Sequence, residues 1–345
     1  MDTPINRRWI LARRPVGRIE ESNFQRADAP IPEPADGEFL VRITHLSFDP
    51  TQRGWLTTDT YVPAIPIGEV VRAKAVGQVV RSRHPGFPVG RMVQGGFGWQ
   101  EYALTSGQTD LMAVTEIPGG ATPEEALGLF GLTGMTAYFG LNEIGRPQPG
   151  DTVLVSAAAG GTGSVAVQLA KAAGCHVIGI AGGPEKCAWV TGVAGADACI
   201  DYKAQNVWRE LGRLAPEGVD VVFENVGGAM LEAAIMRLAQ GGRIVLSGMI
   251  SSYEGDPHAQ KGVRYLLNLC MKRASIRGFI VLDYESRFAE ATRALQALAA
   301  AGKLVGAADV QAGFDNIPAT LNRLFDGRNL GKQLLKVADP PLPVV

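Results

Sequence analysis

The 345-residue sequence has few of the residues that build disulfides and metal centres. Its four cysteines show no Cys-x-x-Cys spacing and its four histidines are widely scattered (Cys175, Cys187, Cys199, Cys270; His45, His84, His176, His258). A zinc site needs closely grouped cysteine and histidine ligands, so no metal is expected. The absence of a disulfide framework favours a reduced, cytoplasmic compartment.

Long apolar runs and clustered charge are also missing. No segment reaches the ~18 apolar residues of a membrane span. The nearest, residues 127–141, is interrupted by glycine and threonine and indicates a buried, closely packed helix. The N-terminus lacks the apolar core of a signal peptide. With a net charge of −1 and no basic run, neither nucleic acid nor a membrane is an expected partner.

The clearest pattern is strand, turn, helix, strand over residues 151–181. Val153 to Val155 are apolar without alternation, as in a strand buried on both faces of a parallel sheet. A small-residue turn follows and ends in Gly160, Gly161, Thr162 and Gly163, and the next apolar residues recur at helical spacing. Ala158 stands where the usual Gly-x-Gly-x-x-Gly pattern has its first glycine. Because the N-terminus of a helix offers free N–H groups to a diphosphate, the pattern predicts a dinucleotide-binding Rossmann unit; a purely structural turn is the alternative.

The end of the second strand indicates which dinucleotide is bound. An acidic residue about 20 residues after the glycine turn would bind the ribose 2′-hydroxyl of NAD. Here the strand ends in Ala181-Gly182-Gly183-Pro184, and Lys186 follows Glu185. Missing negative charge and added positive charge favour a 2′-phosphate, and therefore NADP(H). The alternative is that Lys186 is an ordinary exposed lysine at a helix start.

The pattern of apolar residues changes near Thr122. Before it, short alternating apolar runs separated by glycine and proline predict a mostly β domain. Thr122 and Glu125 form a capping-box pattern that starts a helix. Helices and strands then alternate to about Tyr284, with buried-type strands at Thr152 to Ser156, His176 to Ile180, Ala198 to Ile200, Val219 to Glu224, Arg243 to Ser247 and Ser275 to Val281. The expected fold is α/β: a doubly wound, parallel-sheet Rossmann domain (125–284) inserted into a mostly β domain (1–124 and 285–345).

Short segments in a fixed order carry a family resemblance. They are Leu46-Ser47-Phe48-Asp49-Pro50, Gly131-Leu132-Thr133-Gly134, Glu224-Asn225-Val226-Gly227-Gly228, Gly248-Met249-Ile250-Ser251-Ser252-Tyr253 and Gly327-Arg328-Asn329-Leu330-Gly331-Lys332. Together they resemble the zinc-independent branch of the medium-chain dehydrogenase/reductase superfamily, in particular its prostaglandin reductases, plant double-bond reductases and bacterial curcumin-type reductases.

The resemblance implies roles for individual residues. Lys186 and Tyr202 match positions that hold the 2′-phosphate of NADP(H). Asn225, Asn329 and the loop Ser247, Gly248, Met249, Ile250, Ser251 to Tyr253 match other coenzyme contacts, and Phe279 and Val281 match a stretch beside the nicotinamide. The resemblance also implies that the mostly β domain (1–124 and 285–345) is a GroES-like catalytic domain, and that the protein is a homodimer.

Tyr253 is the expected catalytic residue. It follows a predicted sheet strand by a few residues, and ligands of doubly wound folds lie beyond the carboxyl ends of the strands. A phenol is protonated at neutral pH, so it can donate to an oxyanion that develops on the substrate. The alternative is a residue that anchors the loop or packs on the coenzyme.

These observations predict an NADPH-dependent reductase of the carbon–carbon double bond of α,β-unsaturated aldehydes and ketones. An NADPH-dependent quinone reductase and a non-catalytic NADPH-binding sensor or structural protein are the alternatives. Thr51 stands where the family often has tyrosine, which leaves the choice of substrate open.

Overall fold

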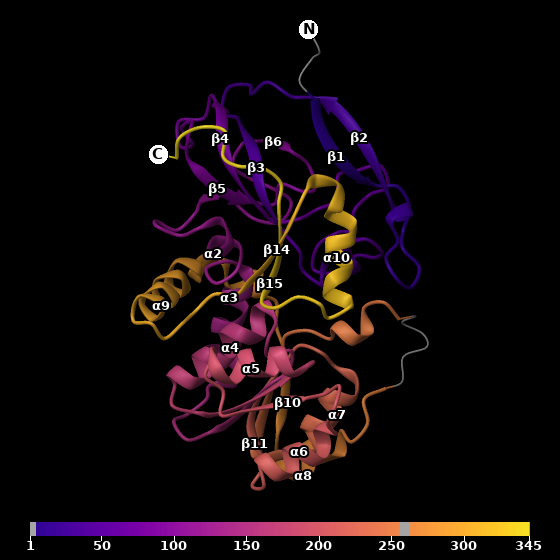
Figure 1. Cartoon of the computed structure of the whole chain (residues 1–345), viewed down its shortest axis with the longest axis vertical. Helices are drawn as coiled ribbons and strands as arrows, with labels where there is room; N and C mark the ends of the chain where they lie inside the picture. Colours follow the sequence, from indigo (N-terminus) through magenta and orange to yellow (C-terminus); the bar gives the residue numbers. More distant parts are fainter. Residues whose placement is uncertain (1–4, 256–261, 345) are drawn as a thin grey trace. The chain divides into compact units, whose positions relative to one another are not determined.

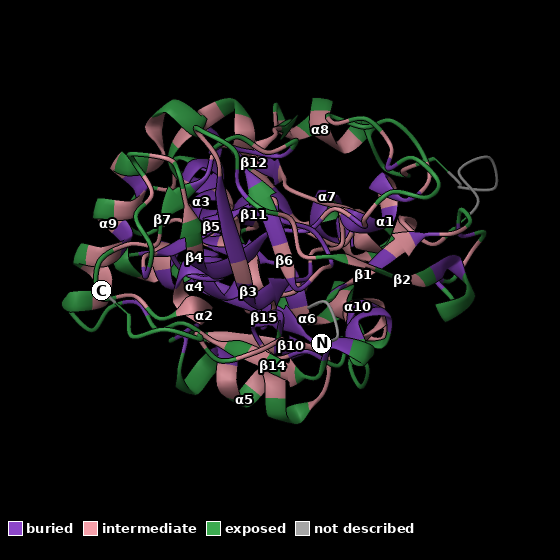
Figure 2. Cartoon of the chain, turned by 90° about the horizontal axis from the view of Figure 1, so that it is seen from above, coloured by how far each residue is buried: buried purple, intermediate pink, exposed green. Residues whose placement is uncertain are grey.

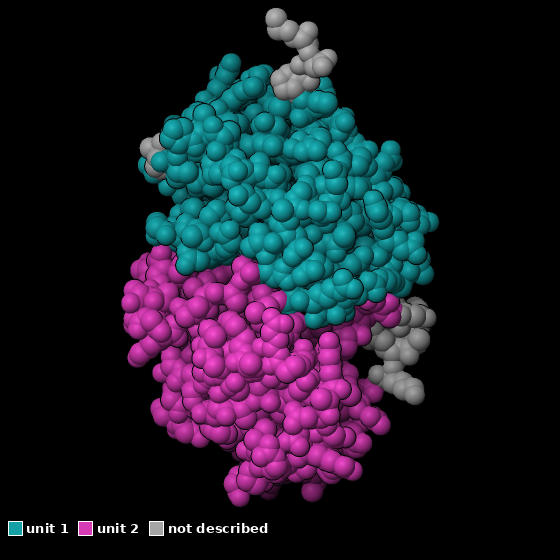
Figure 3. All heavy atoms as spheres, in the orientation of Figure 1, with its two compact units in different colours: residues 1–127, 309–329, 333–345 teal, residues 128–308, 330–332 magenta. Residues whose placement is uncertain are grey.

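The computed structural model describes residues 5–255 and 262–344. Within this part the chain divides into two compact units, coloured separately in Figure 3. Unit 1 contains residues 1–127, 309–329 and 333–345, and unit 2 contains residues 128–308 and 330–332. Unit 2 thus interrupts unit 1 in the sequence, and residues 330–332 belong to it as well.

Unit 1 is mostly β. Strands β1 and β2 form an antiparallel pair, and the larger sheet has the order β14-β15-β3-β4-β5-β7, with β6 paired to β3. The elements are β1 (Ile5–Leu11), β2 (Phe24–Pro30), β3 (Phe39–Ser47), α1 (Gln52–Trp55), β4 (Ala75–Ser82), β5 (Met92–Gly95), β6 (Tyr102–Thr105), β7 (Thr115–Glu116), α2 (Pro123–Leu127), β14 (Ala308–Ala312), α10 (Ile317–Phe325) and β15 (Lys332–Lys336). Most of these elements are labelled in Figure 1, and α1 and β7 are labelled in Figure 2.

Unit 2 is built on a parallel sheet with the order β10-β9-β8-β11-β12-β13. Its elements are α3 (Leu132–Phe139), β8 (Thr152–Val155), α4 (Gly161–Ala172), β9 (His176–Ala181), α5 (Pro184–Gly192), β10 (Ala198–Asp201), α6 (Val207–Leu214), β11 (Val219–Glu224), α7 (Gly228–Met236), β12 (Leu238–Leu246), α8 (Leu267–Lys272), β13 (Ser275–Gly278) and α9 (Phe288–Ala300). When the six strands are numbered by their order in the sequence, their spatial order across the sheet is 3-2-1-4-5-6, which is the doubly wound Rossmann arrangement. The predicted fold class is confirmed.

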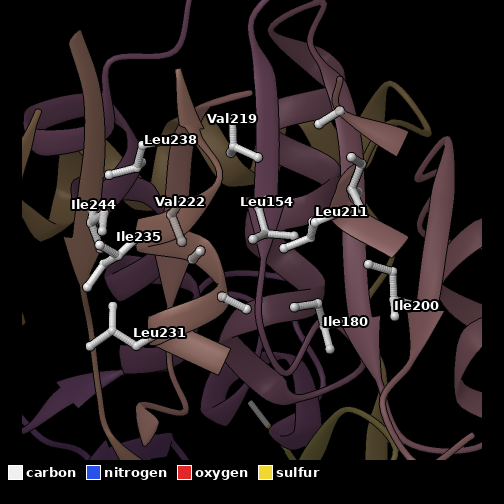
Figure 4. Packing of buried hydrophobic residues seen from close by; sticks show 14 residues of the cluster. Leu154, Ile180, Ile200, Leu211, Val219, Val222, Leu231, Ile235, Leu238 and Ile244 are labelled. Atoms are coloured by element: carbon white, nitrogen blue, oxygen red, sulfur yellow. The ribbon is translucent and has the colours of Figure 1, made fainter. Parts of the chain in front are cut away.

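The core of unit 2 explains why its strands lack alternation. Leu154, Ile180, Val222 and Ile244 come from different strands and are at most 1% exposed, with helix residues such as Leu211 packed against them (Figure 4). In Figure 2 strand β11 is largely buried, whereas the outer face of helix α5 is exposed. Helices on both faces of a parallel sheet bury every side chain of a central strand, which selects continuous apolar runs.

Several local predictions need correction. Residues 127–141 do not form one helix: α2 ends at Leu127, a turn follows, and α3 begins at Leu132 before a π-helical segment at Gly140–Gly145. The apolar run Val70-Val71-Arg72-Ala73, one of the short runs of the first domain, does not form a strand. Only Val70 forms an isolated β-bridge, with Ile10. Glycines at 128 and 131 have no side chain to stabilise a helix, which accounts for the first break.

Helix α9 is grouped with unit 2, whereas the expected boundary at residue 284 placed it with the first domain. Its contacts explain the grouping. A Cβ atom on Gly134 of α3 would lie 3.3 Å from Leu295 of α9, and Arg287 Nη1 lies 2.7 Å from Glu143 Oε1.

The capping box at the start of α2 is confirmed, because the Thr122 and Glu125 side chains accept each other's backbone N–H groups.

No helix in the described part of the chain combines the length and the apolar character needed to cross a bilayer.

Candidate functional site

The predicted coenzyme residues of unit 2 all follow the carboxyl ends of its parallel strands. Gly160 to Gly163 follow β8, Lys186 follows β9, Tyr202 follows β10, Asn225 follows β11, the loop 247–253 follows β12, and Phe279 follows β13. Carboxyl ends of parallel strands share one edge of a sheet, and this edge is where doubly wound folds bind ligands. The topology therefore brings together segments that lie up to 120 residues apart in the sequence.

The glycine turn is tightly closed. Gly160 caps α4 and donates its N–H to the Ala157 carbonyl at 2.8 Å, and Ala157 itself adopts a left-handed conformation with φ of +48°. A Cβ atom on Gly163 would lie 2.2 Å from the Ala157 oxygen, so only glycine fits there. The first turn of α4 thus lies directly against the backbone of the loop. Its free N–H groups and the positive end of the helix dipole form a cradle suited to a diphosphate.

The segment after β9 is held against the end of β10. The Tyr202 ring packs on Gly182, where a Cβ atom would lie 2.8 Å from the ring. Tyr202 also donates its N–H to the Ala181 carbonyl at 3.1 Å. Lys186, in the first turn of α5, is partly buried. The two residues expected to hold a 2′-phosphate therefore extend from neighbouring strands of one sheet.

The loop after β12 contains the predicted catalytic residue. The Tyr253 hydroxyl accepts the N–H of Met249 at 3.2 Å, and it would lie 3.3 Å from a Cβ atom on Gly248. Ile250–Ser252 form a single 3-10 turn between these residues. Tyr253 is partly exposed. The phenol is thus directed back over the start of its own loop, at the carboxyl edge of the sheet.

The turn after β11 joins this loop to β8. Asn225 donates its side-chain amide to the Ser156 carbonyl at 2.8 Å, and its own carbonyl accepts the N–H of Ile250 at 3.2 Å. Sequence reasoning missed two residues here, Ser156 and Glu224, both of which are completely buried. A glutamate that closes an otherwise apolar strand is the signal that could have identified the second.

The remaining predicted residues are Phe279, Val281 and Asn329. Strand β13 ends at Gly278, so Phe279 and Val281 follow it and are not part of it as predicted; Val281 begins a 3-10 segment. Asn329 belongs to unit 1 and is 9% exposed. Two residues later Gly331 donates its N–H to Ala159 at 2.7 Å, which ties the C-terminal segment to the glycine turn.

Two further expectations concern metals and substrate choice. Among the residues that the structure describes, no group of three or more His, Cys, Asp or Glu side chains is arranged to hold a metal ion. Thr51, which stands in place of a tyrosine, shares a hydrogen bond of 2.9 Å with the Tyr61 hydroxyl within unit 1.

Comparisons with known proteins match both parts of the chain. Residues 7–114 match a family described as the N-terminal domain of oxidoreductase, and residues 161–300 match one described as zinc-binding dehydrogenase. The chain is 37% identical to the NADPH-dependent curcumin reductase of Escherichia coli (strain K12), over 96% of this chain and 97% of the relative. It is 34% identical to the NADP(+)-dependent 2-alkenal reductase of Nicotiana tabacum, over 96% of this chain and 98% of the relative.

A solved structure matches over the same extent. The crystal structure of CurA from Vibrio vulnificus in complex with NADPH superposes with a TM-score of 0.91 at 38% identity, covering 97% of this chain and 100% of that chain.

Proposed function

Because the chain belongs to the medium-chain dehydrogenase/reductase superfamily, in the group of curcumin-type, prostaglandin and 2-alkenal reductases, we propose that it reduces the carbon–carbon double bond of α,β-unsaturated aldehydes and ketones. The protein is an NADP-dependent oxidoreductase of the class that acts on CH–CH groups, and NADP(H) is its coenzyme. The observation that carries the proposal is the similarity, at 37% identity over 96% of this chain, to a curcumin reductase. It is supported by the position of Tyr253 in the loop that follows the carboxyl end of β12.

The coenzyme would be held by residues from successive strand ends. The N-terminus of α4, at Gly160 to Gly163, would bind the diphosphate, and Lys186 with Tyr202 would bind the 2′-phosphate. The remaining contacts would come from Asn225, Asn329, the loop Ser247 to Tyr253, Phe279 and Val281. Two unit charges about 4 Å apart attract by about 4 kcal/mol at an effective dielectric of about 20, before solvent screening reduces the value. Half of this corresponds to a preference of more than about tenfold for NADPH.

Tyr253 would assist the reaction at the carbonyl oxygen. When bound, NADPH supplies the hydride that adds to the β-carbon of the substrate. The electron pair of the double bond then moves toward the carbonyl, and negative charge develops on its oxygen. In the structure the Tyr253 oxygen accepts an N–H group, which engages a lone pair and not the hydroxyl proton. The proton therefore remains available for the developing enolate.

A substrate panel tests the proposal. Oxidation of NADPH and of NADH is followed with an alkenal, a benzylidene-type ketone and a quinone. Turnover of the alkenal or the ketone with NADPH, with the saturated carbonyl as product, supports the proposal. Turnover of the quinone alone would instead assign a quinone reductase. Tight NADPH binding without turnover of any acceptor would assign a non-catalytic nucleotide-binding protein.

We also infer a homodimer formed through β13. This strand is the last in the order of the sheet and is exposed along its length. The preceding helix α8 exposes Leu267 by 72% and Met271 by 66%. An exposed strand edge beside apolar side chains suits pairing with a second copy. Ile276→Lys should convert the dimer to a monomer in sedimentation experiments, whereas Val193→Lys, at an exposed position elsewhere in unit 2, should not. A monomeric wild-type protein would contradict the inference.

The expected compartment is the reducing cytoplasm. All four cysteines lie in the described part of the chain and each is a free thiol, as a reducing environment requires.

A further inference from the structure

Glu224 is the last residue of β11 and is completely buried. It lies at the point where the strand order of the sheet reverses, between β8 and β11, which is where doubly wound folds open a crevice for ligands. A carboxyl group without access to water costs folding free energy unless hydrogen bonds compensate it. Its partners therefore indicate what it does.

The Glu224 side chain fixes the turn that follows it. Its Oε1 atom accepts the N–H of Val226 at 2.6 Å and the N–H of Gly227 at 2.7 Å. These are short distances, typical of hydrogen bonds to a charged acceptor. The neighbouring Asn225 N–H is bound by Ser156 Oγ at 2.8 Å. Three successive N–H groups of the turn are thus held by two buried side chains.

The main chain of Glu224 fixes a second loop. Its carbonyl oxygen accepts the N–H of Ser247 at 2.9 Å and that of Gly248 at 3.1 Å, at the start of the loop that carries Tyr253. One residue therefore holds the turn after β11 through its side chain and the loop after β12 through its backbone.

The turn and the loop are also bonded directly to each other. The Asn225 carbonyl accepts the N–H of Ile250 at 3.2 Å, and the Val226 carbonyl accepts both the N–H of Ser251 at 3.0 Å and its hydroxyl at 2.6 Å. A change in the path of residues 225–227 would therefore shift residues 250 and 251. Tyr253 follows two residues later, and its hydroxyl is bonded to Met249 of the same loop.

Burial raises the pKa of the Glu224 carboxyl, and the hydrogen bonds from Gly227 and Val226 oppose this rise. Burial of the carboxyl therefore carries a desolvation cost that its hydrogen bonds offset only in part. An apolar side chain of similar size would avoid this cost but could not direct two N–H groups. The Glu224 carboxyl is thus suited to fixing the geometry of the turn 225–227, and an apolar side chain would fill the same space at a lower cost.

We propose that Glu224 is a positioning residue for the reduction, whose buried carboxyl sets the turn 225–227 and, through it, the loop 247–253 with Tyr253. The assignment rests on the proposed function, because that function gives the loop its coenzyme and substrate.

Two substitutions of similar size separate positioning from packing. Glu224→Gln keeps an oxygen that can accept both N–H groups, whereas Glu224→Met fills the same space and accepts neither. Asp220→Asn is the matched control, because Asp220 also accepts a backbone N–H, from Thr152 at 2.8 Å, but near the opposite end of β11. Steady-state kcat and KM for NADPH are measured with the full chain. NADPH affinity is measured separately by nucleotide fluorescence.

We expect Glu224→Gln to keep kcat/KM within about threefold of the wild type, and Glu224→Met to lose roughly 10- to 100-fold through both a lower kcat and a higher KM, because both hydrogen bonds that fix the turn are removed. Asp220→Asn should keep wild-type kinetics. Equal activity of the Gln and Met variants per folded molecule would overturn the proposal, as would an equal loss in Asp220→Asn.

Two further measurements cover the cases in which Glu224→Met does not fold or the wild type shows no turnover. If Glu224→Met does not fold, Glu224→Asp replaces it, because the shorter side chain withdraws the carboxyl from the turn; wild-type kcat and KM in that variant would overturn the proposal. If the wild type turns over none of the acceptors, the reductase function fails on its own. The fluorescence comparison of the Gln and Met variants then still decides whether Glu224 positions the coenzyme loops.

Discussion

The carboxylate of Asp201 accepts the N–H of Gly183 at 2.8 Å, across the ends of two neighbouring strands. It also accepts the N–H of Lys203 at 3.0 Å, and these backbone donors lower the pKa of Asp201. The acid at the end of β10 is thus used to close the turn that precedes α5. This turn leads into Lys186 and lies beside Tyr202, so the geometry of the predicted 2′-phosphate site depends on it.

Lys186→Ala tests the coenzyme preference. In the proposed site the Lys186 ammonium group faces the 2′-phosphate, so its removal should raise the KM for NADPH by roughly tenfold or more, because the lost attraction amounts to a few kcal/mol before screening. The KM for NADH should stay nearly unchanged, since NADH has no 2′-phosphate. Both are measured by steady-state kinetics, with Lys303→Ala as a control at an exposed site after α9. Equal effects on the two coenzymes would contradict the assignment.

Gly182→Ala tests the contribution of Tyr202. The added Cβ atom would lie within 2.8–2.9 Å of the Tyr202 ring and hydroxyl, so the ring must move. We expect a KM for NADPH that rises about 3- to 10-fold, in line with a perturbed hydrogen bond to a charged group. Gly192→Ala is the matched control, because a Cβ atom there meets nothing within 4 Å. A normal KM in the Gly182 variant would remove Tyr202 from the site.

Tyr253→Phe tests the catalytic hydroxyl. Loss of a positioned proton donor should lower kcat by about 100-fold. The same substitution removes the hydrogen bond from Met249, so NADPH affinity must be measured alongside to show that the loop still binds the coenzyme. Tyr265→Phe, at a tyrosine that is 48% exposed in the same unit, should have no effect. An unchanged kcat in Tyr253→Phe would exclude a role in proton transfer.

Glu101 should make the stability of unit 1 depend on pH. Burial by itself would raise the pKa of this carboxyl, but hydrogen bonds from Arg7 and the charge of Arg42 lower it below its ordinary value of 4.5. A carboxyl with a lowered folded-state pKa contributes stability above its unfolded value and loses it as the pH falls through the folded value. Urea unfolding should therefore show a loss of about 1–3 kcal/mol in Glu101→Gln at pH 7.

The difference between Glu101→Gln and the wild type should shrink as the pH falls from about 4.5, the ordinary pKa, through the lowered pKa of the folded wild-type carboxyl. Glu21→Gln, at an exposed position of unit 1, should follow the wild type throughout. A pH-independent difference would show that the effect comes from packing and not from charge.

The sequence by itself determined the elements that depend on neighbouring residues. The buried strands of the parallel sheet, the glycine turn before α4 and the capping box at Thr122 were predictable, because apolar periodicity, small residues and capping chemistry act over a few positions. The exact bounds of the strand Val219–Glu224 were predictable for the same reason.

Only the tertiary structure decided which distant segments meet. The strand order, the Tyr202 ring on Gly182 and the burial of Glu224 under two loops all depend on contacts between residues far apart in the sequence. The grouping of α9 with unit 2 also follows from such contacts, since local propensity is weak and tertiary packing overrides it. Local patterns therefore determine the helices and strands of this protein. Long-range packing determines the strand order of the parallel sheet, whose carboxyl ends the predicted site residues follow.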